Sequence, residues 1–190
     1  AQPDHRPALL ARARGRSRDG DWRGAEAALS RVVDLDPVGV EARLQRARVR
    51  HDAGLDSAAS ADLDALLARA PLNFEALLLR GEVRLDLGDP AGAQVDLQAA
   101  AHAAATPEEA FLAECVLVGQ TLGSDVALGA GSGKLASLLE KALQFTSPGP
   151  AVVRGRVRLH VALGRVFRLG GAFDSAIASF DKALALDSAS

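Results

Sequence analysis

The sequence predicts an all-α fold, a right-handed superhelical solenoid of about five helix–turn–helix hairpins. Three observations lead to this prediction: a composition rich in Ala and Leu, a 34-residue spacing that many columns of residues share, and a glycine where the two helices of each hairpin should meet. Repeats of this length bury their apolar faces only against neighbouring repeats, so they stack into an elongated array.

The composition favours helix and excludes several classes of protein. Apolar residues make up 48% of the 190 residues, and Ala and Leu, which lose little rotamer freedom in helices, dominate them. The single cysteine, Cys115, excludes an intrachain disulfide framework and predicts a buried structural thiol. No apolar run approaches the roughly 18 residues of a membrane span, so we expect no membrane insertion. The sequence is compatible both with a cytoplasmic protein and with the mature chain of an exported one, so it does not predict the compartment.

Glycine marks the turn of each hairpin. Gly20, Gly54 and Gly88 follow one another at a constant interval of one repeat. A left-handed backbone conformation is needed where the first helix of each pair ends, and only glycine adopts it without strain. Asp89 before Pro90 and Thr106 before Pro107 have the sequence pattern of helix N-caps.

Small and apolar residues repeat at the same interval. A column of small residues should let helix backbones approach closely, a second small column should lie where the helices of a pair cross, and a leucine column should fill the space between hairpins. These columns are Ala13, Ala47 and Gly81; Ala25, Ala59 and Ala93; and Leu29, Leu63 and Leu97. Pro37 and Pro71 should end the second helix of two units.

With these small, Gly, Ala, Leu and Pro columns, the chain resembles the tetratricopeptide repeat family, whose unit is a 34-residue helix–turn–helix. We expect repeats at about 6–39, 40–73 and 74–107, and a single solenoid over residues 1–190. The aromatic columns that the family carries in its first helices are mostly replaced here, so the repeats are degenerate.

The period breaks after the third repeat, because the interval from Gly88 to Gly171 is longer than two repeats and shorter than three. We expect an irregular hairpin over 107–147, with helices at 107–122 and 134–145 and a Gly-rich loop at 123–133. A long final hairpin should occupy 150–188, with its first helix at about 151–169. The loop at 129–134 lacks the first glycine and the final Ser or Thr of a phosphate-binding loop, so we interpret it as an interhelical connection with Ser132 as an N-cap.

Two arginine columns are the most prominent charged pattern. They are Arg12, Arg46 and Arg80, and Arg16, Arg50 and Arg84. Asp62 and Asp96 follow Arg46 and Arg80 at the same offset, just under half a repeat. At this offset the arginine on the first helix of a hairpin should face the aspartate on the second. We therefore predict structural ion pairs for Arg46 and Arg80. Arg12 has Ala28 at the matching position and should lack such a partner.

The resemblance implies a contact surface on the concave face, formed by the first helix of each hairpin. This surface should be basic at both ends and apolar in the third repeat, which suits a partner segment with an apolar centre and acidic flanks. The alternative is that these are solvated residues of a rigid spacer. The implied residues are Leu10, Arg14, Ser17, Leu44, Gln45, Arg48, His51, Leu78, Leu79, Glu82, Leu85, Val161, Arg165 and Arg168.

The last helix should leave an apolar edge uncovered. Ile177, Leu184 and Leu186 would form this edge, which solenoids usually cap with polar surface. We expect a partner subunit, a second copy of the chain, or further residues of a longer chain to cover it.

We expect no catalytic residues, no cofactor and no metal site, because no nucleophile–base arrangement or metal-ligand spacing stands out among the four histidines. Residues 57–150 hold 12 acidic against 5 basic residues and the chain has no Tyr, which disfavours nucleic acid binding. The sequence therefore predicts a non-catalytic protein–protein interaction scaffold or adaptor. The alternatives are a structural subunit held through its terminal edge and irregular fourth hairpin and, more remotely, a helical-repeat RNA binder.

Overall fold

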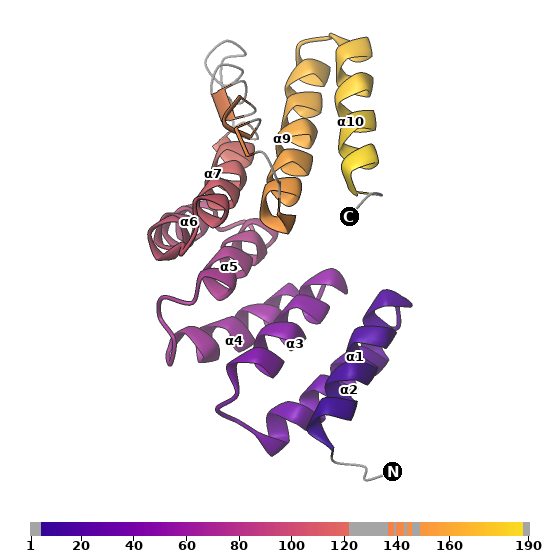
Figure 1. Ribbon diagram of the computed structural model, residues 1–190, viewed down its shortest axis with the longest axis vertical. Coiled ribbons are helices and arrows are strands. Elements are labelled where there is room, and N and C mark those ends of the chain that lie inside the picture. Colours follow the sequence, from indigo (N-terminus) through magenta and orange to yellow (C-terminus); the bar gives the residue numbers. More distant parts are fainter. Residues whose placement is uncertain (1–4, 122–136, 139, 143, 146–148, 188–190) are drawn as a thin grey trace. The chain divides into compact units, whose positions relative to one another are not determined.

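The computed structural model of the protein describes residues 5–121, 137–138, 140–142, 144–145 and 149–187. Helices and the turns between them account for all of these residues, and no strand occurs among them (Figure 1). This confirms the all-α prediction and the organisation in helical hairpins. The helices are α1 (Arg6–Arg18), α2 (Trp22–Leu35), α3 (Val40–Asp52), α4 (Asp56–Leu67), α5 (Phe74–Asp86), α6 (Pro90–Ala103), α7 (Pro107–Thr121), α9 (Pro150–Leu169) and α10 (Phe173–Asp187).

The chain divides into two compact units, Ala1–Asp96 and Leu97–Ser190, with the division inside α6. Each is described by itself below as unit 1 and unit 2. No helix in the described ranges is long and apolar enough to cross a bilayer.

A left-handed glycine lies in each of the described turns that join α1 to α2, α3 to α4, α5 to α6 and α9 to α10. Gly20, Gly54, Gly88 and Gly171 have φ between 73° and 79°. An added Cβ would meet nothing within 4 Å at these positions, so backbone conformation, and not space, accounts for the glycine. The predicted role of the first three is confirmed, and Gly171 has the same role between α9 and α10.

Side-chain caps fix several helix starts. Asp21 Oδ1 accepts a hydrogen bond from Gly24 N at 2.9 Å at the start of α2, and Asp89 Oδ1 accepts one from Gly92 N at 2.9 Å at the start of α6. Thr106 Oγ1 accepts from Glu109 N at 3.2 Å before α7. The caps predicted at Asp89 and Thr106 are therefore confirmed.

Small residues and leucines form the core of unit 1, as the repeat columns predict. Ala25, Ala59, Leu29 and Leu63 are at most 1% exposed. Ala13, Ala28, Leu29 and Val49 pack into one cluster that joins α1, α2 and α3. Alanine in these positions allows neighbouring helices to come close while their side chains remain in van der Waals contact.

Unit 2 has its own core, built around Phe111 of α7. Cys115, Val152, Leu159 and Val166 are buried in the same cluster. Gly155 of α9 lies so close to α7 that an added Cβ would be 2.5 Å from Phe111 Cε1. The pair α9 and α10 forms a hairpin, drawn orange and yellow in Figure 1.

The irregular fourth hairpin is described only in part. Its first helix, predicted at 107–122, is α7 (Pro107–Thr121), and its predicted second helix is helical at residues 137–138 and 140–142. The Gly-rich loop at 123–133 and the N-cap at Ser132 lie outside the described residues. The long helix predicted at about 151–169 is α9, with 20 residues.

Candidate functional site

The arginine column in the middle of each first helix is used for internal ion pairs. Arg46 Nε and Nη2 donate to Asp62 Oδ2 and Oδ1 at 2.8 and 2.6 Å. Arg80 Nε and Nη2 donate to Asp96 Oδ2 and Oδ1 at 2.8 and 2.7 Å. These hydrogen bonds raise the pKa of Arg46 and of Arg80, although burial acts in the opposite direction. The structural pairing predicted for both arginines is confirmed.

The second arginine column also binds these aspartates, which the sequence analysis did not predict. Arg50 Nη1 lies 2.9 Å from Asp62 Oδ2, and Arg84 Nη1 lies 2.7 Å from Asp96 Oδ2. Each aspartate side chain is at most 4% exposed. Arg43 Nη1 also lies 3.6 Å from Asp62 Oδ1, so at least two guanidinium groups neutralise each buried carboxylate. The arginines of the second and third repeats in these columns are therefore engaged internally and not available to an external anion.

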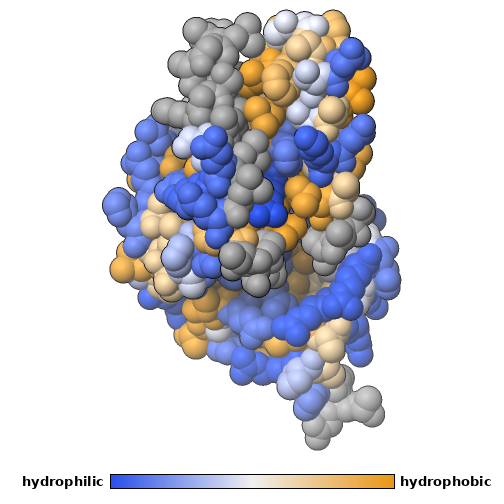
Figure 2. All heavy atoms as spheres, turned by 45° about the horizontal axis from the view of Figure 1, so that its top comes forward, coloured by the Kyte–Doolittle hydropathy of each residue, from blue (hydrophilic) through white to orange (hydrophobic). Residues whose placement is uncertain are grey.

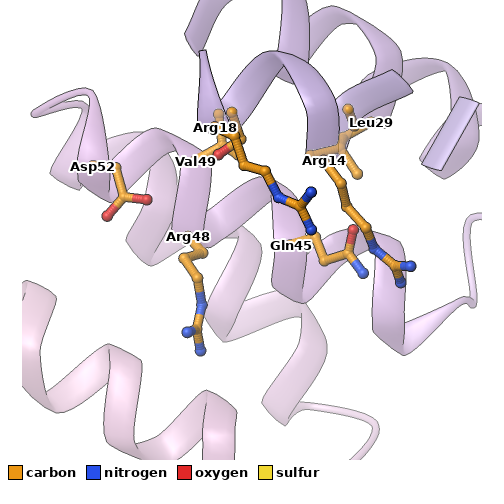
Figure 3. A pocket seen from close by; sticks show the side chains of 9 residues that line it. Arg14, Arg18, Leu29, Gln45, Arg48, Val49 and Asp52 are labelled. Carbon is orange, nitrogen blue, oxygen red and sulfur yellow. The ribbon is translucent and has the colours of Figure 1, made fainter. Parts of the chain in front are cut away.

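A pocket of about 210 Å³ opens between α1 and α3 in unit 1 (Figure 3). Its apolar floor is formed by the buried residues Ala13, Leu29 and Val49. Its polar rim consists of Arg14, Ser17, Arg18, Gln45, Arg48 and Asp52. Four of these rim residues, Arg14, Ser17, Gln45 and Arg48, belong to the predicted concave surface, so the structure brings them together around one hollow. We call this hollow the α1–α3 groove.

The groove carries positive charge on its rim. In Figure 3 the side chains of Arg14, Arg18 and Arg48 extend in the same direction, while Asp52 lies apart from them. Arg14 Nη2 binds Glu41 Oε1 at 2.9 Å in an exposed pair. The side chains of Arg18 and Arg48 have no ion pair or hydrogen bond within the described part of the chain, and both are exposed. Two unpaired guanidinium groups beside an apolar floor can accept a carboxylate together with an apolar side chain.

The remaining residues of the predicted surface differ in exposure. Leu44 and Leu79 are only 8% and 4% exposed, so their side chains belong to the core and offer almost no contact area. The helix turns by about 100° per residue, which places Leu44 and its neighbour Gln45 on different faces. Half-buried residues are Leu10, His51, Leu78, Glu82, Leu85 and Val161, whereas Arg165 and Arg168 are exposed on α9 of unit 2.

Sequence reasoning missed Arg18 and Asp52 on the groove rim. A signal was present, because they occupy equivalent positions in successive repeats and each lies one helical turn after a predicted contact residue, Arg14 or Arg48. Residues one turn apart occupy the same face of a helix, so Arg18 and Asp52 extend the predicted surface.

A histidine and two aspartates also meet in unit 1, a group that no metal-ligand spacing in the sequence indicated. His51 Nδ1 lies 2.8 Å from Asp56 Oδ1 and 3.8 Å from Asp86 Oδ2. The three residues come from α3, α4 and α5, so no spacing within one helix could reveal the cluster.

Large apolar side chains are exposed on α9 and α10 of unit 2. Leu169, Phe173, Ile177 and Leu184 are 58–67% exposed, and Leu186 is half-buried. Figure 2 shows hydrophobic surface, interrupted by polar groups, on the side of this unit formed by α9 and α10. The predicted edge at Ile177 and Leu184 is thus accessible in this chain.

The comparisons with known proteins agree with the repeat pattern. The family model described as tetratricopeptide repeat matches residues 10–59 and 56–110. No curated protein sequence matches the chain significantly.

Solved structures similar to this chain share its fold at low sequence identity. A tetratricopeptide repeat protein of Thermus thermophilus, TTC0263, is 20% identical with a TM-score of 0.69, and the match covers 95% of this chain and 91% of that one. MamA is 20% identical with a TM-score of 0.57, covering 96% and 92% of the two chains. YrrB, whose structure is described as having an unusual peptide-binding site, is 16% identical with a TM-score of 0.56, covering 97% and 88%.

Proposed function

The chain belongs to the tetratricopeptide repeat family, and we propose that it is a non-catalytic interaction scaffold that binds a segment of a partner protein in the α1–α3 groove. The observation that supports this proposal best is the combination of an apolar floor with two arginines, Arg18 and Arg48, that have no ionic partner in the described part of the chain. Unlike Arg46 and Arg80, these arginines do not hold two helices together through an internal ion pair with a described residue.

The chemistry of the groove defines the segment that would fit. A hollow of about 210 Å³ over Leu29 and Val49 accommodates one apolar side chain such as Leu or Phe. Carboxylates close to that side chain on the segment would reach Arg18 and Arg48. We therefore propose an acidic segment with an apolar anchor residue, whose association is accelerated by charge attraction and weakened by salt.

Selection from a displayed peptide library against the full chain tests this proposal. We expect the enriched peptides to share an apolar residue flanked by Asp or Glu. Arg48→Glu should weaken their binding at least tenfold, or about 1.4 kcal/mol. Arg23→Glu is the matched control, because Arg23 is exposed on α2, outside the groove, and the substitution changes the net charge equally. Equal losses in both variants, or peptides without acidic residues, would contradict the proposal.

A structural subunit is the second candidate function, favoured by the exposed apolar side chains of α9 and α10. In that case the chain assembles through this edge and binds nothing in the groove. Light scattering of wild type and Leu184→Glu tests it: a wild-type assembly that the substitution dissociates supports the subunit, and a monomeric mass for both argues against self-assembly. Arg14→Glu with Arg48→Glu separates the two candidates, since only the scaffold should lose its partner.

A further inference from the structure

Three side chains of metal-ligating type converge in unit 1 from the ends of three helices. His51 lies in the last turn of α3, Asp56 is the first residue of α4, and Asp86 is the last residue of α5. One potential ligand atom of each residue lies within 4.8 Å of the other two. We propose that these three residues form a binding site for a divalent transition-metal ion of the Zn²⁺ type. This proposal does not depend on the groove.

The distances are close to those that such an ion requires. Bonds of about 2.0–2.2 Å in tetrahedral coordination place two ligand atoms roughly 3.3–3.6 Å apart. The separations from His51 Nδ1 to Asp56 Oδ1 and Asp86 Oδ2 are 2.8 and 3.8 Å, on either side of that range. The Asp86 side chain is 59% exposed and can rotate, whereas those of His51 and Asp56 are 20% and 19% exposed and held in place. Small side-chain movements therefore complete the geometry.

The charges around the cluster favour a cation. Asp62 and Asp96 are each neutralised by at least two arginines, but Asp56 and Asp86 have His51 as their sole partner within the described ranges. A single imidazole N–H can donate fully to one carboxylate, so the second carboxylate has no donor. His51 and Asp86 also lie at helix C-termini, where backbone carbonyls add negative potential. Asp56 lies at the N-terminal end of α4, where backbone N–H groups add positive potential, so Asp86 is the carboxylate with the least compensation.

The donor set points to a borderline metal ion. One imidazole nitrogen and two carboxylate oxygens suit Zn²⁺ or a similar ion, and three protein ligands leave a fourth position for water or for a partner's side chain. Ca²⁺ and Mg²⁺ require six or more oxygen ligands and should bind poorly here. Binding at Nδ1 requires the imidazole to carry its proton on Nε2, so the ion takes the place of the Nδ1–H that faces Asp56.

Calorimetric titration of ZnCl₂ into the untagged, chelator-treated full chain tests the site. We expect saturable binding of one ion per chain. His51→Ala and Asp86→Asn should each weaken Zn²⁺ binding at least tenfold, and MgCl₂ should give no saturable signal. The controls are His102→Ala and Asp52→Asn, which remove an exposed histidine and the exposed aspartate one repeat before Asp86.

Two results would overturn the proposal. The first is the absence of saturable Zn²⁺ binding to the wild type, which would leave a hydrogen-bonded His51–Asp56 pair only. The second is binding by Asp86→Asn as tight as that of the wild type. Because Asp86 is exposed and its substitution conserves side-chain shape, the variant should fold, and its far-UV circular dichroism spectrum verifies this.

Discussion

Arg46 and Asp62 face each other across the α3–α4 hairpin in a bidentate ion pair, with N–O distances of 2.8 and 2.6 Å. One repeat later, Arg80 and Asp96 show the same arrangement. In both pairs the carboxylate is almost completely buried, while the guanidinium retains some contact with solvent. The buried aspartate is therefore the member whose loss should matter most.

Replacing Asp62 by Asn should lower the free energy of unfolding by about 3–5 kcal/mol, because Arg46 would lose its two-oxygen partner in a site largely shielded from water, while Arg50 would keep only Glu26. Urea denaturation measures the change. Asp64→Asn is the matched control on the same helix: its side chain is 56% exposed and pairs with Arg80, so the expected loss is below about 1 kcal/mol. Equal effects at both positions would contradict this account.

Gly155→Ala should destabilise unit 2 by about 1–3 kcal/mol, because the new methyl group would overlap the ring of Phe111 in the core. Gly15→Ala provides the opposite case. Gly15 lies inside α1 with nothing within 4 Å of an added Cβ, so alanine should stabilise the chain by about 0.4–1 kcal/mol. Thermal unfolding of the two variants should show shifts of opposite sign.

Cys115 should resist alkylation in the folded chain. Its side chain is fully buried in unit 2, and burial raises the pKa of the thiol to about 12. Iodoacetamide at pH 8 should leave the native protein unmodified over hours and modify it rapidly in 6 M guanidinium chloride, as measured by mass spectrometry. Fast modification under native conditions would show that α7 and α9 separate readily.

His160 should make the protein less stable in mild acid. Burial, followed by the charges of Lys182 and Arg156, lowers the pKa of His160 in the folded chain. Near and below pH 6.5 the unfolded chain therefore binds more protons at this residue than the folded chain, so stability decreases as the pH falls through that range.

Urea denaturation at pH 7, 6 and 5 measures this dependence on His160. His160→Leu should flatten the decrease, whereas His102→Leu, at an exposed position on α6, should retain it. An unchanged pH profile in His160→Leu would assign the effect to other groups.

Much of the fold could be predicted because the same residue type recurs every 34 residues at several positions of the repeat. The left-handed glycines at 20, 54 and 88 and the pairs Arg46–Asp62 and Arg80–Asp96 follow from residue types at fixed offsets. Contacts between different repeats were harder to predict. Arg50 binds Asp62 and Glu26 from two hairpins, and no offset within a single hairpin describes both contacts.

The candidate site shows the same division between local and distant information. Arg14, Ser17, Gln45 and Arg48 were predicted as surface residues, and all four line the groove. Leu44 was assigned to the same surface but is buried, since the family's positions define a helix face only approximately for a degenerate repeat. The meeting of His51 with Asp86 depends on α3 lying beside α5, which a linear pattern does not contain.

The arginine network has a consequence for how this array could be shortened or extended. Besides its aspartate in the same hairpin, Arg80 donates to Asp64 of the preceding repeat at 2.7 Å, and Arg46 donates to Ser30 of the preceding repeat at 3.1 Å. Ser30 and Asp64 occupy equivalent positions, so excising residues 40–73 would bring Arg80 opposite Ser30. The Ser30 hydroxyl oxygen already accepts a hydrogen bond from Arg46, the equivalent of Arg80. The hydrogen-bond acceptors between neighbouring repeats are thus interchangeable. Deletion or duplication of a whole 34-residue repeat should leave every arginine at the new boundary between repeats with an acceptor.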